Sequence, residues 1–198
     1  MPELGLDVLR GLTPARKVGS GYNNGGGNWY PITNGYNTNI GEGDPVKISA
    51  GNINIADNLN KVIGTFAQVA YIDAEDKLQF KRNFVAGTSS KGTKVVFGGF
   101  TQPMALVYDD PEQTFIVRTA TSSLASAGMV GRSFKLSAIG SVVNGRSQAI
   151  LDVSASVGTS GGHMVTVVGL YTGRNSRWGT APTAVEVKLS NPGYVNEL

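Results

Sequence analysis

The sequence predicts an all-β protein, and three observations lead to that prediction. About ten short segments alternate apolar and polar residues, at fairly regular spacing, in the manner of strands. Glycine is abundant, at 27 of 198 residues, and turn-forming residues separate the segments. Helical patterning is scarce, with one candidate of two turns at residues 122–129. These features favour a single compact β-barrel or sandwich-like domain with at most one short helix.

The clearest strands of the first half begin after Pro45. Apolar alternation or apolar runs occur at residues 46–48, 63–73, 78–84, 94–98, 104–108 and 114–119. The run at 63–73 is apolar on both faces, as a buried strand requires. We interpret residues 109–113 as a five-residue hairpin loop, because Pro111 cannot donate to a strand ladder.

The second half continues the same pattern. Asn144 and Gly145 form a two-residue hairpin signal, since both residue types tolerate the positive φ angles of that turn. Further strands are expected at residues 151–157, 163–172 and 185–189. The chain then ends in a short, loose tail that contains Pro192.

Residues 1–44 differ from the rest of the chain. A short apolar start is followed by a stretch rich in glycine and asparagine at residues 19–28. Such a stretch buries too little apolar surface to offset its ordering entropy alone. Trp29, Tyr30 and Tyr36 nevertheless follow it, and they suggest a segment that orders against the parent domain or a partner. We therefore predict an extended N-terminal arm over 1–44 and a β domain over 45–198 with a short C-terminal tail.

Composition limits the classes of function. Charged residues make up 16% of the chain and the net charge is +3, which is too small for a nucleic-acid interface. A modest positive charge could favour docking on an acidic surface. No apolar run is long enough for a membrane helix and no targeting segment is evident, so we expect synthesis in a cytoplasm and no membrane contact.

The sequence offers few groups for catalysis. His163 is the single histidine, there is no cysteine, and zinc needs three or four such ligands. Two clusters of carboxylates, at residues 73–76 and 109–112, are explained by turns and lack the spacing of a calcium loop. Residues 87–94 contain glycines and lysines but not in the order of a phosphate-binding loop. We therefore predict no enzymatic activity, no cofactor and no metal.

Two other classes of function stay open at this point. A glycan-binding or adhesin module could stack sugars on aromatic side chains, for which the candidates are Trp29, Tyr30, Tyr36, Tyr171 and Trp178. A hydrolase could use an exposed pair among the carboxylates Asp109, Asp110 and Glu112.

Several segments, in order along almost the whole chain, resemble the head decoration proteins, or capsid cement proteins, of tailed bacteriophages. They are residues 11–16 (GLTPAR), 30–32 (YPI), 40–46 (IGEGDPV), 107–115 (VYDDPEQTF), 144–147 (NGRS) with 151–152 (LD), and 185–191 (VEVKLSN). The Asp-Asp-Pro stretch followed by phenylalanine is the most specific. The closing segment lacks the histidine that is usual in the family, and residues 22–28 form an insert rich in asparagine and glycine.

The resemblance implies a β-tulip-like fold and a structural role in the virion. Proteins of this family sit as oligomers, often trimers, on the outer surface of an icosahedral head. They bridge neighbouring major capsid subunits and strengthen the shell against the pressure of packaged DNA. For this chain the expected partners are thus the major capsid protein and further copies of itself, as a trimer or a dimer.

The residues expected to contact the capsid or another copy lie in the arm and at one loop tip. The N-terminal candidates are Leu4, Leu6, Leu9, Arg10, Arg16 and Lys17. The aromatic candidates are Trp29, Tyr30 and Tyr36, and the loop candidates are Asp109, Asp110 and Pro111. Apolar and aromatic residues commonly anchor protein interfaces, with charged residues around them.

Overall fold

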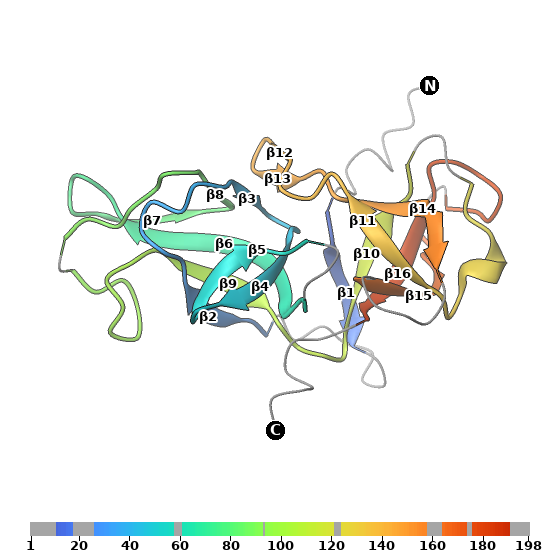
Figure 1. Cartoon of the computed structure of the whole chain (residues 1–198), viewed down its shortest axis with the longest axis horizontal. Coiled ribbons are helices and arrows are strands. Elements are labelled where there is room, and N and C mark those ends of the chain that lie inside the picture. The colour runs from blue at the N-terminus through green and yellow to red at the C-terminus, as the bar shows by residue number, and fades with distance from the viewer. Residues whose placement is uncertain are drawn as a thin grey trace.

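The computed structural model describes residues 11–17, 26–57, 61–92, 94–120, 124–157, 164–173 and 176–190. These residues form sixteen strands and one turn of 3-10 helix, which confirms the all-β prediction (Figure 1). The strands gather into two groups that lie side by side. We name them the inserted lobe and the split lobe. None of the described helical residues forms a helix long and apolar enough to cross a membrane.

The inserted lobe comprises one continuous stretch of the chain, residues 28–108. Its main sheet has the order β2-β9-β6-β4-β5, with β7 also paired to β6, and β3 pairs with β8 alongside it. The bounds are β2 (Asn28–Pro31), β3 (Ile40–Gly41), β4 (Pro45–Ser49), β5 (Asn52–Ile55), β6 (Gly64–Ile72), β7 (Leu78–Lys81), β8 (Asn83–Phe84) and β9 (Met104–Tyr108).

The split lobe combines a strand from the start of the chain with strands from its second half. Its sheet has the order β1-β10-β16-β15-β11-β14, and the β12–β13 hairpin projects from it toward the inserted lobe (Figure 1). The bounds are β1 (Thr13–Lys17), β10 (Gln113–Arg118), β11 (Ser133–Ser137), β12 (Val142–Val143), β13 (Arg146–Ser147), β14 (Ile150–Val157), β15 (Val165–Leu170) and β16 (Ala184–Leu189).

Both main sheets are strongly curved. In the split lobe, Leu151 of β14 forms an isolated bridge with Thr119, directly after β10. In the inserted lobe, the edge strands β2 and β5 approach one another. Across the described residues neither sheet closes by continuous strand pairing, so the sandwich-like form of the prediction describes them better than a closed barrel.

Each lobe has its own apolar core, as the alternating patterns require. The split lobe buries Phe115, Phe134 and Leu151, together with Leu12 from just before β1. The inserted lobe buries a separate cluster that includes Phe66 and Phe84. The alternation at residues 185–189 does not separate a buried face from an exposed one. Glu186, on the face opposite the valines, is also largely buried.

The segment predicted to be an extended arm contributes strands to both lobes. β1 pairs antiparallel with β10, β2 pairs with β9, and β3 pairs with β8. Position 44 therefore does not divide the described chain into an arm and a domain. The local sequence could not reveal this, because each of these pairings joins segments that lie more than forty residues apart.

The expected hairpin at residues 109–113 is wrong. β9 pairs with β2 and β6 in the inserted lobe, whereas β10 pairs with β1 and β16 in the split lobe. The Asp-Asp-Pro loop is thus a crossover between the lobes. Two strands joined by a short turn give the same sequence signal whether they pair as a hairpin or belong to different sheets.

Three other local expectations can be compared with the structure. The Asn144-Gly145 hairpin is confirmed, with φ angles of 51° and 78° between β12 and β13. The strand expected at residues 94–98 is wrong, because this segment forms a loop in which Gly98 and Gly99 have positive φ. The helix candidate is reduced to a 3-10 turn, Ala127–Met129, and residues 121–123 lie outside the described part.

Candidate functional site

The end of β1 in the split lobe meets the Asp-Asp-Pro loop, where the chain passes from the inserted lobe to the split lobe. Lys17 Nζ at the end of β1 lies 2.5 Å from Asp110 Oδ2. Hydrogen bonds from the Lys17 ammonium and from the Glu112 backbone N–H hold the pKa of Asp110 below its usual range. The end of β1 and the exit of the inserted lobe are therefore held together, and we name this corner the first junction.

Asp109 completes the first junction from the inserted lobe. Its side chain is largely buried, and its Oδ2 accepts hydrogen bonds from Tyr30 Oη at 2.5 Å and Asn28 Nδ2 at 2.8 Å. A hollow of about 540 Å³ lies beside these groups, lined by Gly26, Gly27, Asn28, Tyr30 and residues 109–111. The sequence thus proposed Lys17, Tyr30, Asp109, Asp110 and Pro111 as separate contact candidates, and the structure brings them together.

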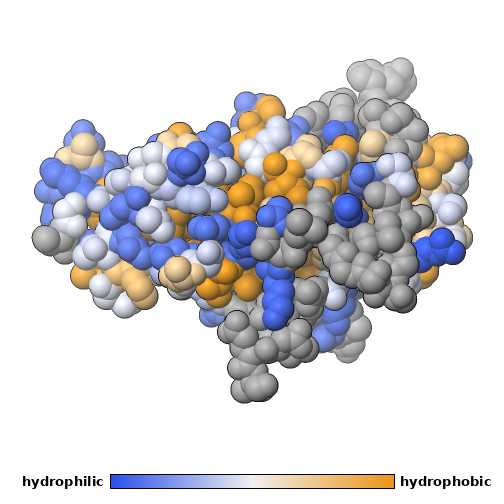
Figure 2. All heavy atoms as spheres, in the orientation of Figure 1, coloured by the Kyte–Doolittle hydropathy of each residue, from blue (hydrophilic) through white to orange (hydrophobic). Residues whose placement is uncertain are grey.

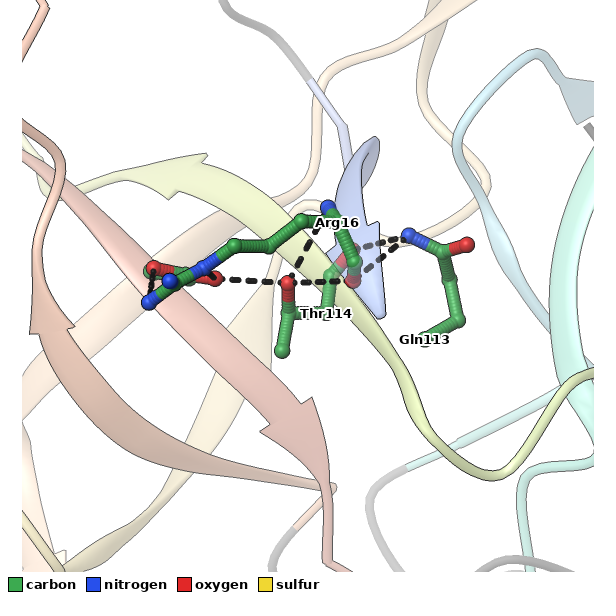
Figure 3. A network of polar contacts seen from close by, with 4 residues as sticks. Arg16, Gln113 and Thr114 are labelled. Carbon is green, nitrogen blue, oxygen red and sulfur yellow. Dashed lines mark hydrogen bonds and ion pairs between the residues drawn. The ribbon is translucent and has the colours of Figure 1, made fainter. Parts of the chain in front are cut away.

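Arg16 joins three strands of the split lobe. Its Nε and Nη2 donate to the two carboxylate oxygens of Glu186 on β16, at 2.7 and 3.0 Å (Figure 3). The Thr114 hydroxyl lies 2.6 Å from Glu186 Oε1 and 2.7 Å from the Arg16 carbonyl, and its single proton serves one oxygen at a time. Gln113 Nε2 donates to the same carbonyl at 3.1 Å. Together these contacts fasten the edge strand β1 to the sheet.

A second junction lies around Asp44, in the turn between β3 and β4. Asp44 is fully buried and accepts hydrogen bonds from Ser147 Oγ at 2.5 Å, Gly41 N at 2.8 Å and Gly140 N at 3.2 Å. Burial raises the pKa of Asp44, and the hydrogen bonds from Ser147, Gly41 and Gly140 oppose that rise. Since Ser147 and Gly140 belong to the split lobe, one carboxylate links the two lobes.

Backbone contacts surround Asp44 and explain the glycines of the IGEGDPV segment. Leu12 N donates to Gly43 O at 2.9 Å, and Ser147 N donates to Glu42 O at 3.0 Å. Gly43 has a φ of +90°, and a Cβ on it would lie 3.0 Å from Leu12 N. A Cβ on Gly41 would lie 2.6 Å from Ser147 N. Side chains at these two positions would therefore push the lobes apart.

The β12–β13 hairpin adds charge pairing to the second junction. Glu42 forms a bridge with Arg146 in the backbone, and its Oε2 lies 3.5 Å from Arg146 Nε and 3.8 Å from Arg82 Nε. These distances are long and the side chains are partly exposed, so the pairs contribute little to stability by themselves. Backbone hydrogen bonds from Glu42 N to Gly145 O and from Ser147 N to Glu42 O, both at 3.0 Å, hold the Asn-Gly-Arg-Ser hairpin beside β3.

Some of the remaining candidates are outside the described residues: Leu4, Leu6, Leu9, Arg10 and His163. Tyr36 packs against the core of the inserted lobe, and its hydroxyl accepts a hydrogen bond from Ile55 N at 3.2 Å. Trp29 packs instead on a small cluster with Phe97. The five aromatic residues considered for sugar stacking are distributed over four apolar clusters: Trp29, Tyr30, Tyr36, Tyr171 and Trp178.

The carboxylates considered for catalysis are occupied by structural contacts. Asp109 accepts from Tyr30 and Asn28, Asp110 pairs with Lys17, and both oxygens of Glu112 lie 3.0 Å from Lys188 Nζ. Among the residues that the structure describes, no group of three or more histidine, cysteine or acidic side chains is arranged to hold a metal ion.

Two surface features were not singled out from the sequence. One is a groove of about 570 Å³ between the lobes, lined mainly by the end of β5 and by residues 135–140. Apolar atoms also gather over β4 and β5 near the middle of the molecule (Figure 2). The other feature is an exposed apolar end of the inserted lobe, around Phe80 and Phe100. The alternation at residues 78–84 predicts a half-exposed strand, but it does not reveal that the apolar face, which carries Phe80, is exposed.

Comparison of the chain with protein-family models, with curated proteins and with solved structures finds no match in any of the three.

Proposed function

We propose that this chain is a non-enzymatic structural protein of a virion. In this role it binds the outer surface of an icosahedral phage head, bridges neighbouring major capsid subunits and stabilises the shell against internal DNA pressure. The active unit is a homo-oligomer, a trimer or a dimer. The proposal rests on the resemblance of the sequence to head decoration proteins and on one observation about where the resembling segments lie.

That observation is the convergence of four resembling segments on the two junctions. Residues 107–115 and the end of 11–16 adjoin the Lys17–Asp110 contact at the first junction. Residues 40–46 and 144–147 meet at Asp44 and Ser147 in the second. These four segments are distant in sequence, and they supply the polar contacts that join the lobes at both junctions. This convergence supports treating the segments as a single set rather than as separate weak matches.

The use of polar groups also favours a binding role over hydrolysis. The carboxylates at residues 109–112 already accept hydrogen bonds or pair with lysines, so none of them is arranged as a free acid and base pair facing a substrate. A protein that bridges capsomers needs only modest affinity at each contact. An oligomer that touches several subunits at once gains through effective concentration.

The experiment is to quantify the chain in purified virions of the phage whose genome encodes it. Quantitative mass spectrometry is expected to find a copy number comparable with that of the major capsid protein. Heads prepared without the chain are expected to release DNA at a lower temperature, and adding purified protein is expected to restore the original temperature. Absence from virions, or only a few copies at a vertex or a tail, would refute the proposal.

A further inference from the structure

The tip of the β12–β13 hairpin consists of an asparagine followed by a glycine. Asn144 is exposed, and its φ of 51° is the left-handed value that this turn requires. Within the described part of the chain, no residue forms a hydrogen bond with the Asn144 side chain or with Gly145 N–H. The hydrogen bond from Glu42 N reaches Gly145 O, which belongs to the next peptide group. The peptide group between Asn144 and Gly145 can therefore rotate without breaking a hydrogen bond to a described residue.

A second pair of the same type, Asn34 and Gly35, is held in place by the loop that follows β8. Asn34 Oδ1 accepts a hydrogen bond from Ser90 N, and Gly35 N donates to Thr88 O, both at 3.0 Å. Asn34 and Gly35 are exposed, so exposure does not distinguish this pair from the hairpin tip. The difference is that both reactive groups are hydrogen bonded here. A third Asn-Gly pair, at residues 24–25, lies outside the described residues.

We propose that Asn144 is a site of spontaneous deamidation, which converts it into aspartate and isoaspartate. Gly145 N attacks Asn144 Cγ and closes a five-membered imide, and the side-chain nitrogen leaves as ammonia with the proton that Gly145 N gives up. Water then opens the imide at either carbonyl and returns a proton to Gly145 N. A glycine after the asparagine favours the attack because it has no side chain to obstruct it. The reaction consumes only water, so it does not depend on the proposed function.

The hairpin tip is also a point of contact between the two lobes. Glu42 N donates to Gly145 O at 3.0 Å, and β12 and β13 both contact β3 (Figure 1). A Cβ on Gly145 would lie 2.7 Å from Arg82 Cγ, so the turn packs closely on the inserted lobe. Isoaspartate adds a methylene group to the main chain before Gly145 and displaces its carbonyl from Glu42. Formation of isoaspartate thus weakens the second junction, whereas aspartate keeps the length of the main chain.

The first test follows the two described Asn-Gly pairs in the full-length wild-type protein. One sample is incubated folded and another in urea, both at mildly alkaline pH, which speeds the loss of the proton from the glycine nitrogen. Peptide mapping by mass spectrometry, with fragmentation that distinguishes aspartate from isoaspartate, gives the rate at Asn34 and at Asn144. Each rate in the folded protein is divided by the rate at the same residue in the unfolded protein. This ratio removes the effect of the neighbouring sequence.

We expect Asn144 to react in the folded protein within about threefold of its rate in the unfolded protein, because no hydrogen bond to a described residue protects it. Asn34 should react at least about tenfold more slowly when folded, since two hydrogen bonds must break before the attack. Protection of Asn144 as strong as that of Asn34 would overturn the proposal. Asn144 that stays intact while the unfolded protein converts would overturn it as well.

The second test measures the effect on the junction. Wild type, Asn144→Gly and Asn144→Asp are each compared, fresh and aged, by the urea midpoint of unfolding. Asn144→Gly is the matched control, because glycine fits the positive φ and has no side chain to react. We expect a lower midpoint for aged than for fresh wild type, no change on ageing for Asn144→Gly, and fresh Asn144→Asp close to fresh wild type.

Two results would contradict the weakening of the junction. One is an aged wild type that contains isoaspartate at residue 144 but unfolds at the midpoint of the fresh protein. The other is an equal fall of the midpoint on ageing in the wild type and in Asn144→Gly, which would assign the loss of stability to a different residue.

Discussion

Asp44 shows how much a single residue contributes to the union of the two lobes. A fully buried carboxylate is costly unless hydrogen bonds surround it. Here the donors come from both lobes, because Gly41 belongs to the inserted lobe and Gly140 and Ser147 to the split lobe. Asp44 therefore stabilises the protein only when the two lobes are correctly placed against one another. Its removal leaves buried hydrogen-bond donors without an acceptor.

We predict that Asp44→Ala destabilises the protein by about 3 kcal/mol, because three hydrogen bonds are lost and their donors stay buried. Urea unfolding followed by circular dichroism measures this change. Asp57→Ala is the control, since Asp57 is exposed and its carboxylate lies 3.7 Å from Lys47. The control should cost less than about 1 kcal/mol. Equal losses in the two variants would contradict the role given to Asp44.

Glu186 gives a prediction about pH. The hydrogen bond from Arg16, assisted by Thr114, lowers the pKa of Glu186 below its ordinary value of 4.5. A carboxylate with a lowered pKa in the folded state adds stability above pH 4.5, and this contribution is lost as the pH falls through the folded pKa. Asp44, whose pKa is raised, acts in the opposite direction. Glu186→Gln should therefore lose less stability between pH 6 and pH 3 than the wild type does.

The measurement is a series of urea unfolding curves over that pH range. Thr114→Val should fall between the wild type and Glu186→Gln, because it removes one donor to the carboxylate and leaves Arg16 in place. If the free energy of unfolding falls with pH by the same amount in all three proteins, the Arg16–Glu186 pair has no part in the loss of stability at acid pH.

Among the elements, β1 shows best what the sequence could and could not predict. Strands with a strong local pattern were predictable, such as β6 from its apolar run and β16 from its alternation of apolar and polar residues. β1 contains a proline and few apolar residues, and it owes its place to contacts with β10 and Glu186. Those contacts join residues that are 96 or more positions apart, and no local signal encodes them.

The candidate site was likewise predictable where a local pattern marks a residue and not where distant segments come together. Tyr30 and Asp110 could be picked out because they lie in segments that resemble a family, and Lys17 as a basic residue of the predicted arm. Their convergence could not be predicted, because it depends on contacts between β1, β2 and the loop after β9, which are distant in the sequence. The apolar end was missed for a related reason: alternation identifies β7 as a strand but does not reveal that its apolar face lacks a covering layer.

We predict that two N-terminal deletions differ sharply. Deleting residues 1–10 leaves every described strand in place and serves as the reference. Deleting residues 1–17 removes β1 and the buried Leu12, and should cost more than about 3 kcal/mol. Thermal unfolding followed by circular dichroism distinguishes the two. Similar melting temperatures for both deletions would show that β1 is dispensable.

At the scale of the whole molecule, the two lobes are joined by polar junctions and by a small apolar contact. Each lobe has its own buried cluster, and the polar connections run through Lys17, Asp44 and Asp110. Ala56 and Val62 of the inserted lobe pack in the cluster of the split lobe. A protein built in this way can transmit load between its lobes as long as the junctions hold. It also has a built-in reporter for each lobe, because Trp29 lies in the inserted lobe and Trp178 packs on the core of the split lobe.

We predict that the lobes of the wild-type protein unfold together. Trp178→Phe leaves Trp29 to report on the inserted lobe, and Trp29→Phe leaves Trp178 to report on the split lobe. Urea midpoints from tryptophan fluorescence should coincide with the midpoint from circular dichroism in each single-tryptophan protein. Adding Asp44→Ala should separate the two fluorescence midpoints. Midpoints that already differ without this substitution would contradict cooperative coupling through the junctions.

The place of β1 in the split lobe has a consequence for synthesis on the ribosome. Arg16 and Thr114, which hydrogen bond in the finished sheet, are 98 residues apart. At translation rates of about 5–20 residues per second, β1 waits roughly 5–20 s before β10 emerges to pair with it. Every strand of the inserted lobe has been made by then. The inserted lobe can thus be complete while β1 is still unpaired, and the split lobe closes last around β1, the first of the described strands to be translated.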